Sequence, residues 1–170
     1  MAIWRLVVPT LMLSAIACSS EVLSADLTVE VTGVRAGGGK IVFDLWRQGS
    51  DATRFPSFGS VPESKTNGKT GARSCDWTQG RTSICRQSVV VSGTSVSYTF
   101  RGLPNDKYAV SVFHDKDASW DANPGPPFNV PKEGYGVSVE SGPPPLIPDF
   151  DSAKLSIDGT RSISIQLIYR

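Results

Sequence analysis

The chain has 170 residues, with 17 basic side chains, 16 acidic side chains and a single histidine, so its formal charge near neutral pH is +1. A nearly neutral chain without a strongly basic stretch is not expected to bind nucleic acid through the phosphates. The length is enough for one domain with a substantial hydrophobic core.

The first 25 residues are typical of an export signal. Arg5 is followed by the apolar run 6–17, which has the length of a signal-peptide core and is too short to span a bilayer. Cleavage after Ala25 would give a periplasmic or secreted protein, which is the favoured interpretation. Cleavage before Cys18, where the preceding residues form an imperfect lipobox, would give a lipid-anchored one. No transmembrane segment is expected in the mature chain, residues 26–170.

The cysteines fit an exported protein. Without Cys18, which lies in the signal region, Cys75 and Cys85 remain as a pair, and such a pair is predicted to form a disulfide in an oxidising compartment. A zinc site at these thiols is not expected, because His114 is the only histidine that could complete it.

Alternating apolar and polar residues predict strands along most of the mature chain, and no window repeats with the period of a helix. Two hairpins are predicted, across the turns at 37–39 and 92–94, and Asp158-Gly-Thr is a further turn signal. We therefore expect an all-β, antiparallel β-sandwich of about seven strands with negligible helix. The strands are predicted at 27–34, 40–46, 88–91, 95–100, 108–113, 153–157 and 162–169.

Two stretches lack this alternation of apolar and polar residues. Residues 47–87 are rich in Gly, Ser and Thr and predict a long insertion, of which a Cys75–Cys85 disulfide would fix the second half. Residues 140–149 contain four prolines and predict an extended crossover rather than a central strand.

An acidic loop follows the strand that ends at His114. Its oxygen-bearing side chains alternate, as they do in calcium-binding loops, and Glu133 could add a carboxylate from the returning segment. The loop is not an EF-hand, because Trp120 and Pro126 stand where that motif requires Gly and Glu. The candidate ligands of a calcium-like ion are Asp115, Asp117, Ser119, Asp121, Asn123 and Glu133. The other interpretation, which is favoured because Trp120 replaces the glycine that a tight ion-binding loop would need, is a set of Asx turns, in which the Asp side chains accept hydrogen bonds from backbone amides.

The remaining candidate residues favour structural roles. His114 is expected to be buried and hydrogen-bonded, and to point away from Asp115, because neighbours on a strand face opposite sides. Tyr135 is expected to pack under the acidic loop, with Gly134 and Gly136 permitting a bend. Three tryptophans could form a sugar-stacking surface, although core packing for the first and loop anchoring for the others is favoured; they are Trp46, Trp77 and Trp120.

The stretch His114–Ser138 resembles bacterial exported proteins grouped as the domain of unknown function 2141 family. The matching elements are His114-Asp115, the acidic loop, and Pro131-Lys-Glu-Gly-Tyr-Gly-Val-Ser138. The flanking strands also fit, whereas 47–87 looks like an enlarged insertion. The resemblance implies an exported, immunoglobulin-like or transthyretin-like sandwich of unassigned function. Members usually carry Gly where Trp120 stands and Asn where Ser119 stands.

These observations favour a non-enzymatic binding or structural module of the cell envelope, with the acidic loop as its ligand-facing end and calcium as the one cofactor suggested. A domain that binds a polysaccharide or another envelope component through the 47–87 insertion is the alternative. A hydrolase is the third possibility, but no nucleophile is placed beside a base in the sequence.

Overall fold

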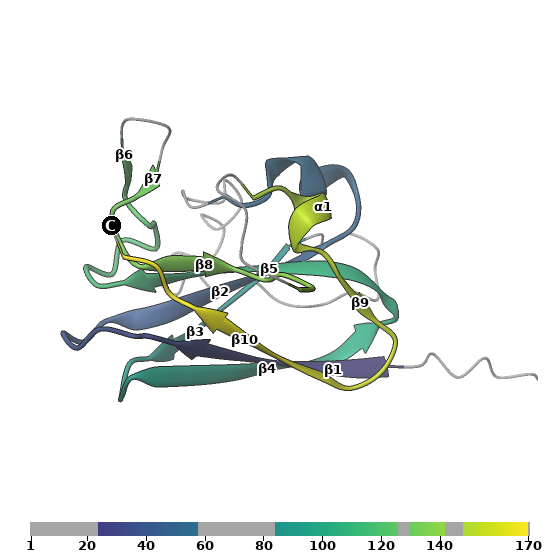
Figure 1. The fold of residues 1–170 in the computed structure, drawn as a ribbon, viewed down its shortest axis with the longest axis horizontal. Helices are drawn as coiled ribbons and strands as arrows, with labels where there is room; N and C mark the ends of the chain where they lie inside the picture. Colours follow the sequence, from purple (N-terminus) through teal and green to yellow (C-terminus); the bar gives the residue numbers. More distant parts are fainter. Residues whose placement is uncertain (1–23, 58–83, 126–129, 142–147, 170) are drawn as a thin grey trace, which may run out of the picture.

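The computed structural model describes residues 24–57, 84–125, 130–141 and 148–169. The described chain is mostly β, and its strands form two facing sheets and a separate two-stranded ribbon of β6 and β7 (Figure 1). The smaller sheet has the order β10-β1-β4, and the larger has the order β3-β2-β5-β8, with β9 also paired to β5. This arrangement is consistent with the predicted β-sandwich.

Strands β1 to β5 supply most of both sheets: β1 (Ser24–Thr32), β2 (Lys40–Arg47), β3 (Ile84–Val90), β4 (Ser95–Pro104) and β5 (Asp106–Asp115). The others are β6 (Pro124–Gly125), β7 (Val130–Pro131), β8 (Tyr135–Val137), β9 (Leu155–Ile157) and β10 (Arg161–Gln166). Helix is limited to the 3₁₀ turn η1 (Ser50–Arg54) and to α1 (Phe150–Ala153). Residues 84–87 of the predicted insertion are therefore strand, and Ala153 is helical rather than extended.

The predicted hairpins are wrong. β1 pairs with β4 and β10, whereas β2 pairs with β3 and β5, so the turn at 37–39 crosses from one sheet to the other. The turn at 92–94 likewise joins β3 in one sheet to β4 in the other. Turn residues specify a reversal of the chain, but the two strands they join can face each other across a core instead of sharing hydrogen bonds.

The sheets are also not purely antiparallel. β10 runs parallel to β1, with Leu27 opposite Arg161 and Val31 opposite Ile165. Beyond β10 the chain reaches the other sheet, where Tyr135 and Ile168 exchange two backbone hydrogen bonds of 3.0 and 2.8 Å. This bridge links β8 of the larger sheet to the end of the chain.

The larger sheet is covered on both faces. Alternate residues of β2 and β5 point into the sandwich core, among them Phe43, Leu45 and Val110. The residues between them face away from the smaller sheet, yet they are buried too, because η1, α1 and the loops pack over them (Figure 1). Nearly every position of these two strands is therefore buried, as the nearly continuous apolar runs in their sequences allow.

Other predictions concern residues outside the described ranges. The signal sequence up to residue 23 and most of the 47–87 insertion, with Cys75 and Trp77, lie outside them. Cys85 is buried on β3 and is disulfide-bonded, but its partner lies outside the described residues, so the pairing with Cys75 stays a prediction. Within the described part, no helix is long and apolar enough to cross a membrane.

Candidate cation site at the acidic loop

The acidic loop begins where β5 ends, and Asp115 is its buried anchor. The Asp115 carboxylate accepts hydrogen bonds from the backbone amides of Ser119 and Trp120, both at 3.1 Å. It also forms an ion pair of 3.2 Å with Lys40, which stands directly opposite on β2. Asp115 is fully buried, so these three donors replace the water that its charge would otherwise require.

Asp117 organises the exposed side of the loop. One oxygen accepts from the Ser119 amide at 3.0 Å, and the other accepts from the side-chain amide of Asn123 at 3.0 Å. The Ser119 side chain contributes most, and together with the bonds from the Ser119 amide and Asn123 it favours the charged carboxylate and lowers the pKa of Asp117 to about 2. The predicted Asx-turn geometry is thus present around both aspartates.

Glu133 reaches the loop from the segment between β7 and β8. One of its carboxylate oxygens accepts from the Lys116 amide at 2.9 Å. The other, Oε2, is buried and has no hydrogen-bond partner. Burial and then the neighbouring charges of Asp117 and Asp115 raise the pKa of Glu133, although the bond from Lys116 opposes this. The site therefore contains a carboxylate oxygen that the protein itself leaves unsatisfied.

The three carboxylates converge. Oxygen atoms of Asp115, Asp117 and Glu133 all lie within 4.8 Å of one another. The other candidate ligands serve the loop itself: the Ser119 hydroxyl donates to the Asp121 carbonyl, and Asp121 accepts from the Asn123 amide. Of the six residues predicted from the sequence, the structure thus gathers three carboxylates, and it uses the other three to shape the turn.

The loop backbone is held in an unusual conformation. Ala118, Trp120 and Asn123 have φ values of 60°, 61° and 50°, in the left-handed region that favours glycine. At Trp120 several contacts hold the residue in this conformation. Its amide donates to Asp115, its carbonyl accepts from Arg86 at 3.1 Å, and Lys40 lies 3.3 Å from the centre of its ring.

Arg86 ties the loop to the sheet through a buried ion pair that is not predicted from the sequence. Its guanidinium binds Asp44, its direct neighbour on β2, through two hydrogen bonds of 2.6 and 2.7 Å. Its third nitrogen donates to the Trp120 carbonyl. Burial works against the charge of Arg86, but the charge and hydrogen bonds of Asp44 outweigh it and raise the pKa of Arg86.

His114 lies on the opposite face of β5, as predicted, and is fully buried. Its Nε2 donates to the Gly38 carbonyl at 2.7 Å, and its Nδ1 lies 2.8 Å from the Tyr169 hydroxyl. With both ring nitrogens engaged in holding the Gly38 turn and the last residues of the chain, His114 has a structural role.

The glycines beside Tyr135 allow neighbouring side chains to approach the backbone closely. A Cβ atom at Gly134 would collide with the Tyr169 ring, and one at Gly136 would lie 2.6 Å from a methyl group of Ile165. Glycine is needed at both positions because neighbouring side chains approach the backbone closely. Tyr135 itself is half-buried and packs against the cluster of Val42, Phe113 and the loop residue Ala122.

The tryptophans that the structure describes do not form a sugar-stacking surface. Trp46 is fully buried and donates to Ser111 at 3.1 Å, and the ring of Trp120 is covered by Lys40. This confirms core packing for the first and loop anchoring for the second.

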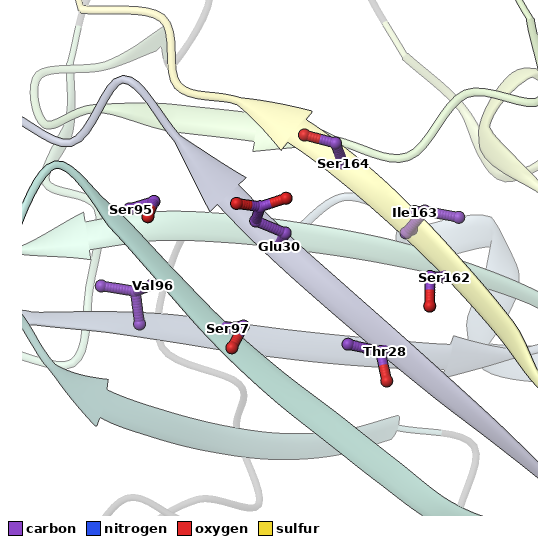
Figure 2. A pocket seen from close by; sticks show the side chains of 8 residues that line it. All are labelled: Thr28, Glu30, Ser95, Val96, Ser97, Ser162, Ile163 and Ser164. Carbon is purple, nitrogen blue, oxygen red and sulfur yellow. The ribbon is translucent and has the colours of Figure 1, made fainter.

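A shallow hollow lies on the outer face of the smaller sheet (Figure 2). Small hydroxyl side chains surround Glu30 there, and no histidine, cysteine or second carboxylate is among the lining residues. The lining residues are Thr28, Glu30, Ser95, Val96, Ser97, Ser162, Ile163 and Ser164. Such a polar face is usual for a sheet that packs on one side only.

A family model described as an uncharacterized protein conserved in bacteria (DUF2141) matches residues 29–165. The chain belongs to this family. The matched range spans both sheets and the acidic loop, and it confirms the resemblance seen at His114–Ser138. No curated protein and no solved structure matched the chain. The DUF2141 assignment therefore supports a β-rich domain and names no activity.

The Arg86–Asp44 pair provides a test of how the loop is held. Arg86→Met should destabilise the fold by about 3–5 kcal/mol, because it leaves the buried Asp44 carboxylate without a partner. Arg101→Met removes an exposed ion pair with Asp26 and should cost less than about 1 kcal/mol. Urea denaturation of both variants gives the comparison, and equal small losses would contradict the anchoring role.

Proposed function

We propose that this protein is an exported, non-enzymatic binding module whose acidic loop holds a divalent cation, with Ca²⁺ as the best match. The observation that carries the proposal is the convergence of Asp115, Asp117 and Glu133 within 4.8 Å, together with the buried, unpartnered oxygen of Glu133. An ordered sandwich with its ligand at one end is how immunoglobulin-like and transthyretin-like folds place function.

The charge of the cluster favours a divalent ion. Three carboxylates and the ammonium of Lys40 sum to −3 + 1 = −2. Carboxylate oxygens are the preferred ligands of Ca²⁺, which accepts irregular geometry, whereas Mg²⁺ demands a near-ideal octahedron. A bound ion would relieve the mutual repulsion of the carboxylates and give the Glu133 oxygen a partner.

The backbone hydrogen bonds to Asp115 and Asp117 are compatible with this role. A carboxylate oxygen can accept more than one interaction, so the Asx turns can preorganise the loop without using up its capacity for a cation. Preorganised ligands lose less conformational entropy on binding than flexible ones.

Several contacts support a binding role over a catalytic one. His114 uses both ring nitrogens for structural contacts, and Cys85 is disulfide-bonded. The hydroxyl nearest the carboxylate cluster, that of Ser119, donates to the Asp121 carbonyl and so helps to shape the turn.

The melting temperature tests the cation site. With Ca²⁺ at about a hundredfold excess over Kd, binding to the folded state adds about 2.7 kcal/mol, so the melting point should rise by about five degrees or more. Asp117→Asn should abolish the rise. Asp121→Asn, a matched change in the same loop outside the cluster, should keep it. No rise in the wild-type protein would show that the loop is only a set of Asx turns.

Export is the second part of the proposal, and the fold supports a cleavage site upstream of the one favoured by the sequence. Ala25 is 1% exposed in the core opposite Leu103, and Ser24 pairs with Pro104. Cleavage after Ala25 would remove both residues from β1. Cleavage after Ala17 leaves the strand whole and makes Cys18 the first residue, free for a lipid anchor.

In the oxidising compartment we propose that Cys75 and Cys85 form the disulfide that fixes the insertion.

Intact mass spectrometry of the protein recovered from a bacterial envelope fraction tests this site. We expect a chain that begins at Cys18, with or without the added mass of a diacylglycerol group. Cys18→Ser should keep the same cleavage point if the protein is simply secreted, and should block processing if it is lipidated. A mature chain that begins at Asp26 would contradict the assignment.

A further inference from the structure

Lys40 is the only basic side chain that forms an ion pair with the carboxylate cluster in the described part of the chain. Its ammonium lies 3.2 Å from Asp115 Oδ2 and 3.3 Å from the centre of the Trp120 ring. The side chain is only 16% exposed. Lys40 stands directly opposite Asp115 in the pairing of β2 with β5. The position of Lys40 is therefore fixed by the register of the sheet and does not depend on a flexible loop.

We propose that Lys40 is a built-in competitor for the cation: its ammonium neutralises Asp115 in the empty site, and an incoming Ca²⁺ must share that carboxylate with it. This inference rests on the cation site proposed above and names what regulates its affinity. Asp115 is fully buried and would be costly to leave without a positive neighbour. Lys40 thereby keeps the empty loop folded.

The same charge opposes the metal. A unit positive charge about 5 Å from a divalent ion weakens its binding roughly tenfold, even at the dielectric constant of water. The expected result is a weak, reversible site. Calcium-binding modules outside the cell typically have dissociation constants of about 10⁻⁴–10⁻³ M, which matches a site with three carboxylates and one tethered ammonium.

Lys40 can be replaced by an uncharged side chain that still packs on the Trp120 ring. Lys40 packs on the Trp120 ring, and a methionine thioether also makes favourable contact with aromatic rings. Lys40→Met therefore removes the charge while keeping a similar side chain over the ring. Lys40→Arg keeps the charge in the same place and controls for changes in shape.

Lys107 provides a matched control. It is an exposed lysine at the opposite end of β5, in register with Ser156 of β9. Lys107→Met changes the net charge of the protein by the same amount as Lys40→Met, but far along the strand from Asp115. Any difference between the two variants therefore reports the local charge and not the overall charge.

Titration calorimetry with calcium chloride, at fixed ionic strength, tests the inference on the purified protein. We expect Lys40→Met to bind Ca²⁺ roughly tenfold more tightly than the wild type, and Lys40→Arg and Lys107→Met to stay within about twofold. In the absence of Ca²⁺, Lys40→Met should melt at a lower temperature than the wild type, and calcium should restore the loss.

The outcomes separate the two proposals. Absence of calcium binding in both the wild type and Lys40→Met would overturn the cation site itself. Binding by the wild type with unchanged or weaker binding by Lys40→Met would keep the site and overturn the competitor role. If Lys40→Met does not fold without calcium, Lys40→Gln replaces it in the same titration. Lys40→Gln also removes the charge, so it is expected to bind calcium more tightly than the wild type.

Discussion

The arrangement of the candidate site depends on one buried ion pair, between Asp44 and Arg86. The two residues stand opposite each other on β2 and β3, on the face of the larger sheet that points away from the sandwich core. An ion pair there is stable only if the remaining donors are satisfied. Arg86 meets this condition by donating to the carbonyl of Trp120, which lies in the acidic loop. The hydrogen bond from Arg86 to Trp120 therefore holds the loop against the sheet.

This folding back gives the larger sheet two covered faces and gives the loop a rigid base. Val42 and Phe113 of the sheet pack with Ala122 and Trp120 of the loop. On one side of this cluster lies the Arg86–Asp44 pair, and on the other lies the Lys40–Asp115 pair. Asp115 is thus fixed by a strand, and Glu133 arrives on the segment that leads into β8. A cation site built on paired strands is more precisely placed than one built on a free loop.

The sequence predicted the location of most strands and of the acidic loop, because alternation and turn residues are local signals. It did not predict which strands pair, since hairpin-like turns such as 37–39 join strands of different sheets. It also did not predict the contacts of Lys40, Arg86 and Tyr169. Their partners, Asp115, Asp44 and His114, lie 75, 42 and 55 residues away in the sequence. One local signal was available for Arg86: Asp44 is a charged residue within an otherwise apolar strand, which implies a buried partner.

The proposed cation site at Asp115, Asp117 and Glu133 can be observed directly. The most direct measurement is a crystal structure of the protein grown in calcium, compared with crystals grown in a chelator. We expect a calcium ion about 2.3–2.6 Å from oxygens of all three carboxylates, with Glu133 Oε2 no longer unpartnered. Identical loops in both crystals, with only water or a protein donor near that oxygen, would contradict this expectation.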